Sequence, residues 1–244
     1  LAFSPISTLL LSSLLLSLSS GIIGGNEVVP HSRPYMAYLK IQVTNNTGTF
    51  HSYCGGFLIR PDAVLSAAHC SRDLWMNVTV ILGAHNIRVQ EQSQQRIRVR
   101  NFVVHPNYDP DGHVNDIALL KVWPNKSFLP GDLPLLTSPT SELVAGWGRT
   151  SLGNNRTNVM MEGRGNLFFK AGRACLTPLI PFMTQGDSGG PLICNQKAHG
   201  IVSRRPSGLL FPAAFTRVSH FVPWIPQQLR RFALQELPAS PSSQ

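Results

Sequence analysis

The sequence predicts an all-β sandwich or barrel with a single helix near the C-terminus. The chain contains many short apolar runs rich in Val, Ile, Leu and Phe, each of strand length rather than helix length. Clusters of Gly, Pro, Asn, Asp and Ser separate these runs at irregular intervals. A chain of 244 residues is within the size that one all-β domain reaches.

The candidate strands are the apolar runs that turn residues bound on either side. In order they are Met36–Val43, Gly56–Ile59, Ala63–Ser66, Val78–Leu82, Ile97–Val104, Ile117–Val122 and Pro191–Ile193. The turn clusters between them are Asn45–Gly48, Pro106–Gly112, Ser138–Ser141 and Ser207–Gly208.

The helix is predicted where apolar residues repeat at helical spacing. Ser219 is the expected N-cap, and Pro223 and Pro226 are compatible with a helix only within its first turn. Residues 235–244 are expected to form a disordered tail. The apolar residues are Phe221, Trp224, Ile225, Leu229 and Phe232.

The N-terminal segment indicates a secretory signal. Residues 1–20 are apolar, rich in Ser and uncharged, so we predict a signal peptide and a short propeptide remnant over 1–21. A membrane anchor is the alternative, but Ser and Pro interrupt the run and no basic flank follows it. No later stretch reaches the roughly 18 apolar residues that span a bilayer, so no stable membrane anchor is expected.

The charge balance is basic, with 21 Lys and Arg against 12 Asp and Glu and a net charge of +9. This balance favours anionic partners such as sulfated glycans or acidic membranes, although a merely soluble basic surface has the same composition. No nucleic-acid-binding motif accompanies the charge, so nucleic acid is not an expected partner.

The cysteines and sequons fit a secreted protein. No two of the four cysteines have C-x-x-C spacing, which argues against a zinc or redox site, and secretion permits disulfides. The cysteines are Cys54, Cys70, Cys175 and Cys194. The glycosylation sequons are at Asn45, Asn77, Asn125 and Asn155.

Three short motifs supply the residue types of nucleophilic catalysis. In Gly186–Pro191 (GDSGGP), glycines surround Ser188, and such a turn can direct successive N–H groups at one point. Alone this segment is also compatible with a turn between strands. His69 lies in AAHC, and Asp116 precedes the apolar run IALL. A serine nucleophile requires a base for its proton, and the chain offers histidine, aspartate and serine in that order.

These motifs resemble those of the chymotrypsin-like serine proteases, over Ile22 to about Phe232. Further landmarks are IIGG at Ile22–Gly25, AGWG at Ala145–Gly148 and FTRV at Phe215–Val218. Within the family, the sequence is similar to the leukocyte granule branch in the segments Pro30–Tyr38, Leu82–Asn86 and His199–Ser203. The resemblance implies two packed six-stranded antiparallel Greek-key barrels and a short C-terminal helix, with the protease domain over 22–234.

The resemblance also assigns catalytic roles. Ser188 would attack the scissile carbonyl, His69 would carry the proton, and Asp116 would orient His69 and stabilise its charged form. The N–H groups of Gly186 and Ser188 would form the oxyanion hole.

Two further roles follow from the same resemblance. The freed ammonium group of Ile22 would pair with buried Asp187 as an activation switch. Ser203 would lie beside Asp116 and begin the strand edge that pairs with substrate.

Some positions depart from the family pattern. The resemblance implies a Cys54–Cys70 disulfide, worth about 3 kcal/mol by loop closure. Glu142 stands where the partner of Cys194 belongs, and the partner of Cys175 is missing, so two thiols are expected there. Ser188 follows Trp147 by only 41 positions, about a dozen fewer than this branch has.

The specificity pocket is unusual as well. No carboxylate occurs between residues 176 and 185 or between 201 and 215, the two segments that would line it. Phe182 would lie near its base, Ala213 on its wall and Arg205 at its mouth. Apolar substrate side chains are therefore expected, with acidic ones paired to Arg205 as the alternative.

The sequence thus predicts a monomeric serine endopeptidase, secreted or stored in granules, that needs no cofactor or metal. Its expected partners are protein or peptide substrates and heparin-like glycans. The alternative is a catalytically impaired homologue that acts as a cationic antimicrobial or glycan-binding protein. A chain that does not fold stably is the third possibility.

Overall fold

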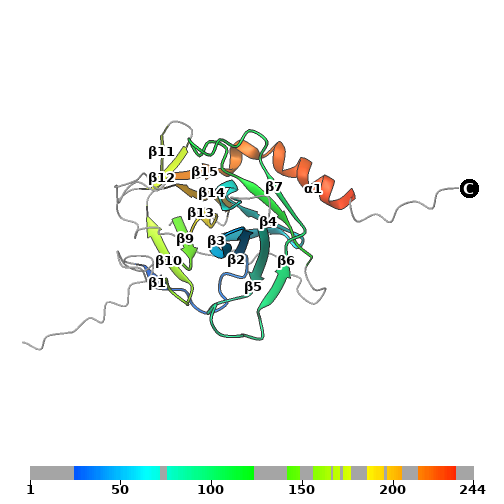
Figure 1. The fold of residues 1–244 in the computed structure, drawn as a ribbon. Coiled ribbons are helices and arrows are strands. Elements are labelled where there is room, and N and C mark those ends of the chain that lie inside the picture. Colours follow the sequence, from blue (N-terminus) through cyan, green and yellow to red (C-terminus); the bar gives the residue numbers. More distant parts are fainter. Residues whose placement is uncertain are drawn as a thin grey trace, which may run out of the picture.

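The computed structural model describes residues 25–71, 76–123, 142–148, 156–165, 167–170, 173–176, 186–194, 197–204 and 214–234. Strands dominate these residues and form two antiparallel sheets, with one α-helix near the C-terminus (Figure 1). The predicted all-β fold class is confirmed.

The first sheet curls until its two edges meet. Its strand order is β6-β5-β2-β3-β4-β8-β7, which places β6 and β7 at opposite edges. Only residues 99 and 100 separate these two strands along the chain, so the edges must lie close together and the sheet forms a barrel. Its strands are β2 (Met36–Asn45), β3 (Gly48–Arg60), β4 (Ala63–Ser66), β5 (Met76–Leu82), β6 (Gln95–Arg98), β7 (Asn101–Val104) and β8 (Ala118–Lys121).

The second sheet is curved in the same way. Its order is β1-β10-β9-β13-β14-β15-β12-β11, and β10 and β11 lie near opposite edges although only residue 166 separates them. Its strands are β1 (Asn26–Glu27), β9 (Glu142–Gly146), β10 (Met161–Gly165), β11 (Leu167–Lys170), β12 (Arg173–Leu176), β13 (Pro191–Cys194), β14 (Lys197–Arg204) and β15 (Ala214–Arg217).

The strand counts of seven and eight differ from the expected six in each barrel. The difference has a simple cause, because β6 with β7 and β10 with β11 are each one bent strand cut at the bend. Counting each bent strand once, and setting aside the two-residue β1, gives six strands in each sheet.

The core of the first barrel follows from alternation along its strands. In β2, Leu39 and Ile41 are buried at 0% and 1% exposure, whereas Lys40 between them is exposed. Val80 from β5 and Leu120 from β8 are fully buried on the same face of the sheet. Truncating one of these leucines to alanine is expected to cost about 2–5 kcal/mol of stability.

The C-terminal helix differs from the prediction at its start. A 3₁₀ turn, η2, covers Val218–Phe221, and α1 covers Trp224–Leu234, so Ser219 lies inside the turn and does not cap the α-helix. The cause is Pro223 and Pro226, whose missing N–H groups confine them to the helix start. In α1, Trp224 and Phe232 are buried, and the Lys121 ammonium of β8 donates to the Phe232 carbonyl at 2.5 Å.

The two sheets meet where β3 faces the loop before β13. The N–H of Gly55 in β3 donates to the carbonyl of Ser188 at 2.6 Å. Nearby, the ring of Tyr38 in β2 packs edge-on against Trp147, with centroids 5.5 Å apart. The Ser188 loop therefore lies at the seam between the sheets.

Among the described residues, no helix is long and apolar enough to cross a membrane.

Candidate active site

His69 is held by a short turn at the end of a buried strand. β4 ends at Ser66, and the 3₁₀ turn η1 covers Ala68–Cys70. Cys70 is bonded to Cys54 of β3, which confirms the disulfide that the resemblance implied. The turn and the disulfide together fix the backbone on both sides of His69.

Asp116 lies opposite His69 and is completely buried. Its carboxylate accepts hydrogen bonds from the His69 ring Nδ1 at 2.7 Å and the His69 backbone N–H at 2.9 Å. The Ser203 hydroxyl donates to the same carboxylate at 2.5 Å, and the Thr216 hydroxyl donates to the Asp116 backbone carbonyl at 2.9 Å. The Asp116 carboxylate therefore accepts hydrogen bonds from His69 of the first barrel and from Ser203 of the second.

The protonation state of Asp116 follows from these contacts. Burial acts to raise its pKa, but the His69 hydrogen bond and charge, and the Ser203 hydroxyl, outweigh burial and hold the pKa below its ordinary value. Asp116 is thus ionised at neutral pH and favours the Nδ1–H tautomer of His69.

The residue before Asp116 is in the left-handed region. Asn115 has a φ of 54°, which asparagine tolerates better than most residues. Its side-chain amide donates to the Asn107 carbonyl at 2.8 Å. This contact ties the loop before β8 to itself and fixes the point from which Asp116 enters the site.

Ser188 lies in a turn that requires glycine on both sides. Gly186 has a φ of 115° and Gly189 a φ of 84°. A Cβ on Gly189 would lie 2.2 Å from the Ser66 hydroxyl and 2.4 Å from the Gly55 carbonyl. The turn therefore packs directly against the strand ends that lead to His69.

The backbone N–H groups of this turn fall into two groups. Gly189 donates to the Val202 carbonyl at 2.8 Å, and Gly190 donates to the Asp187 carbonyl at 2.9 Å. Within the described part of the chain, the N–H groups of Gly186 and Ser188 donate to no other residue. These two groups are available to a ligand.

Asp187, between them, points away from solvent and is fully buried. Its carboxylate accepts a hydrogen bond from the Gly148 N–H at 2.8 Å, and a Cβ on Gly146 would lie 2.3 Å from the same oxygen. A buried carboxylate is costly without a charged partner. Ile22, the partner that the resemblance implies, lies outside the described residues.

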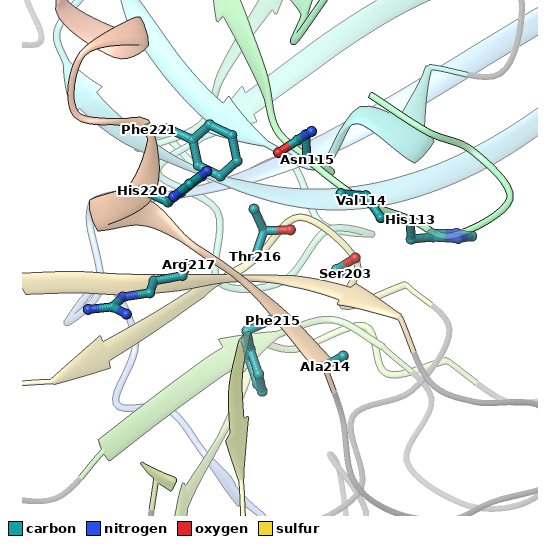
Figure 2. A pocket seen from close by; sticks show the side chains of 10 residues that line it. All are labelled: His113, Val114, Asn115, Ser203, Ala214, Phe215, Thr216, Arg217, His220 and Phe221. Carbon is teal, nitrogen blue, oxygen red and sulfur yellow. The ribbon is translucent and has the colours of Figure 1, made fainter. Parts of the chain in front are cut away.

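Ser203, which donates to Asp116, also lines a small cavity. The cavity holds about 240 Å³. Figure 2 shows Ser203, Asn115 and Thr216 around it, with His220 and Phe221 closing one end. The ring of His113, another lining residue, has its centroid 5.5 Å from that of His69, so the cavity adjoins the histidine.

The remaining specificity residues are not placed by the structure. Phe182, Arg205 and Ala213 lie outside the described residues, as does Ile22. The sulfurs of Cys54 and Cys70 lie within 4.8 Å of a His69 ring nitrogen, but they are bonded to each other and offer no thiolate for a metal.

The two remaining cysteines lie on different strands. Cys175 is in β12, and Cys194 is a buried thiol in β13. β13 pairs with β9 so that Ile193 is opposite Leu143. One further step in this antiparallel register sets Glu142 opposite Cys194, the position that the family resemblance gave to the cysteine's partner.

Comparison with known proteins settles the family. A family profile described as Trypsin matches residues 22–225. The chain belongs to the trypsin family of serine proteases. Human cathepsin G is 42% identical over 90% of this chain and 92% of its own length. Mouse granzyme F is 39% identical over 91% of this chain and 98% of its own length.

A solved structure agrees with these relatives. The structure described as "Structure of GrC" is 36% identical and superposes with a TM-score of 0.72, covering 85% of this chain and 99% of its own. The predicted resemblance to the leukocyte granule branch is confirmed by these matches.

Some residues of the site were not predicted from the sequence. Thr216 supports the Asp116 backbone, although it lies in the landmark segment Phe215–Val218 that the sequence singled out. His113 adjoins His69, and no local signal marked it. Arg156 lies over the ring of Tyr53, 4.6 Å from its centroid, and only the fold brings the two together.

Proposed function

We propose that this chain is a serine endopeptidase that hydrolyses peptide bonds through an acyl-enzyme. The observation that carries the proposal is the His69–Asp116 pair, in which the His69 ring is hydrogen-bonded to a fully buried carboxylate, beside a glycine turn that contains Ser188. The family supports the same reading, because its relatives are named proteases. No cofactor or metal is required by this chemistry.

In the proposed reaction, the Ser188 hydroxyl oxygen attacks the scissile carbonyl carbon and its proton passes to His69. The carbonyl becomes an oxyanion. The carbon–nitrogen bond then breaks, and His69 returns the proton to the leaving amine. Water hydrolyses the remaining ester by the same two proton transfers, which regenerates Ser188.

The oxyanion is stabilised by the Gly186 and Ser188 N–H groups. Their lack of a described acceptor supports this role. Removing one such donor in an enzyme of this type costs about 10²–10³ in kcat. Because both donors come from the backbone, the left-handed φ of Gly186 is the feature on which their direction depends.

The proposed activation switch joins the Ile22 ammonium to the Asp187 carboxylate. The complete burial of Asp187 next to Gly186 and Ser188 supports it, since an ion pair there would order the turn that carries both donors.

The proposed specificity is for apolar side chains before the scissile bond. It rests on the absence of carboxylates from the two segments that would line the pocket. Acidic side chains paired with Arg205 remain the alternative.

Labelling by a fluorophosphonate probe tests the proposal. Protein that begins at Ile22 is expected to react covalently, and a Ser188→Ala variant should not. A folded protein that stays unlabelled would overturn the enzyme reading and favour a non-catalytic cationic binding protein. Protein that reacts with the probe is then used to cleave a peptide library, which tests specificity. Dominant cleavage after Lys or Arg would contradict the apolar pocket.

We further propose that the enzyme is monomeric and is secreted or stored in granules. The relatives cathepsin G and granzyme support this location by their names and branch. The net charge of +9 supports heparin-like glycans as storage or surface partners.

A further inference from the structure

A large groove lies on the first barrel, separate from the cavity beside Ser203. It encloses about 730 Å³ between β2, β3, β5 and the segment around Thr157. Two of its lining residues are tyrosines, Tyr38 and Tyr53, whose rings stack at 5.6 Å. None of its lining residues belongs to the Ser203 cavity.

The groove is lined by four cations and by no described carboxylate. The cations are Lys40, Arg88, Arg96 and Arg156. Within the part of the chain that the structure describes, every ion pair involves other residues. Glu91 lines a neighbouring hollow that shares Arg96, but its carboxylate accepts from the backbone N–H groups of His85 and Asn86.

Arg156 connects this groove to the catalytic turn. Its guanidinium lies 4.6 Å from the Tyr53 ring centroid, and its Nε lies 3.8 Å from the position of a Cβ on Gly186. Burial raises the pKa of Tyr38 to about 12, so the hydroxyl beside Arg156 stays neutral and leaves the arginine charge uncompensated. The groove therefore begins at the proposed oxyanion donor.

The direction of a substrate chain decides which part of it meets the groove. Residues before the scissile bond would run along Ser203, whose cavity lies on the Asp116 side of the catalytic turn. The chain that follows the scissile bond must leave on the other side. Arg156 and Tyr53 line the groove, and Arg156 also lies next to Gly186, so we assign the groove to that part of the substrate.

We propose that this groove binds acidic side chains in the first few residues after the scissile bond, so that Arg156 and Arg96 determine leaving-group specificity. The inference rests on the proposed protease function. Carboxylates on the substrate would supply negative charges opposite the four cations. The two tyrosines are neutral, so they do not compete with the substrate for these cations. A sulfated glycan is the competing occupant, and the experiment below separates the two.

Paired peptides test this inference. The two peptides share the residues before the scissile bond and differ after it, with Glu and Asp in one and Gln and Asn in the other. Wild-type enzyme is expected to cleave the acidic peptide with a kcat/KM about fivefold higher or more, chiefly through KM. The preference should shrink when salt is raised, because exposed charges are screened.

Arg98, on the same strand as Arg96, provides a matched control. Arg96→Gln and Arg156→Gln should each reduce the preference, whereas Arg98→Gln should leave it unchanged. Arg98 is also on β6 and exposed, but it hydrogen-bonds to Asn77 and does not line the groove. Equal cleavage of both peptides by wild-type enzyme would overturn the inference, as would an undiminished preference in both groove variants.

A small ester substrate with nothing after the scissile bond separates this inference from the proposed activity. Ester hydrolysis without peptide discrimination would refute the groove assignment alone. If the ester is not hydrolysed, the peptides are compared by binding to Ser188→Ala protein, where tighter binding of the acidic one supports the inference and equal binding refutes it. Heparin binding lost in Arg96→Gln, with both peptides treated alike, would assign the groove to glycans instead.

Discussion

At Asp116, three donors from two residues converge on one buried carboxylate. Two of the donors belong to His69, the proposed base, whereas the Ser203 hydroxyl comes from the second sheet. Ser203 therefore adds a contribution from the second barrel to the lowered pKa of Asp116, after the larger contributions of His69.

Replacing Ser203 by Ala is expected to destabilise the fold in a pH-dependent way. A folded-state pKa held below the ordinary value adds stability above the unfolded pKa of about 3.9, and this stability is lost as the pH falls through the folded pKa. Removing the Ser203 hydroxyl raises the folded pKa. Urea unfolding should show a loss of about 1 kcal/mol near neutral pH and a smaller loss in strong acid.

The half-buried Ser32 provides the control for this measurement. Its hydroxyl donates to the Val29 carbonyl and contacts no carboxylate, so Ser32→Ala should show no such pH dependence. A destabilisation by Ser203→Ala that stays constant from neutral to acid pH would contradict the role of the hydroxyl.

The Asp187 switch makes a second prediction at this scale. Protein that retains Ser20 and Gly21 before Ile22 has no ammonium at Ile22, so the buried Asp187 carboxylate cannot form the proposed ion pair. Breaking such a pair costs about 3–5 kcal/mol, so esterase activity should fall by about a hundredfold or more. Asp187→Asn in protein that begins at Ile22 should show a similar loss, and full activity in either protein would refute the switch.

The sequence predicted individual residues best where their chemistry is local. The motifs around His69, Asp116 and Ser188 require glycine, cysteine or an apolar strand beside them, and the structure brings all three to one seam. Arg156 and Tyr53 are about a hundred positions apart in the sequence, and their contact depends on the closure of the whole fold. No local pattern encodes a contact of that kind.

At the scale of elements, the Cys54–Cys70 disulfide joins β3 to η1 and is the covalent support for His69. It closes a separation of 16 residues, for which the loop-entropy estimate is about 3 kcal/mol. We expect Cys54→Ala/Cys70→Ala to lose about this much stability and to lose activity as well, because η1 would no longer be fixed against β3.

Alkylation in denaturant without reductant provides the accompanying measurement. Beside the Cys54–Cys70 disulfide, the sequence predicts thiols at Cys175 and Cys194, so the wild-type protein should gain two adducts and the double variant should gain the same two. A wild-type protein with no adducts would show a second bridge between Cys175 and Cys194.

Some strands could be predicted from their own residues, and others could not. β4 matches the predicted run Ala63–Ser66, because it is buried on both faces. The run Ile97–Val104 is cut into β6 and β7, since the barrel bends there. By contrast, β10 has the sequence MEGRG and β14 has KAHGIVSR, which alternate too weakly to predict. Pairing with β9 and β15 makes strands of them.

At the scale of the whole molecule, the net charge of +9 is fixed by the composition, and the fold determines which of the cations are exposed. Of the cations that line the groove, Lys40, Arg88 and Arg96 are exposed, so a long polyanion can reach several of them at once. Such contacts sum over many weak pairs, each of which salt screens beyond about 8–10 Å at physiological strength.

Heparin affinity is therefore the prediction that belongs to the whole surface. Mature protein should bind a heparin column and elute only above physiological salt, because several exposed cations are neutralised together. Arg96→Gln and Arg98→Gln should shift elution by similar small amounts, since a surface-wide attraction depends on the number of charges more than on their place. A much larger shift for Arg96→Gln would instead locate the glycan in the groove, and elution at or below physiological salt would contradict the prediction.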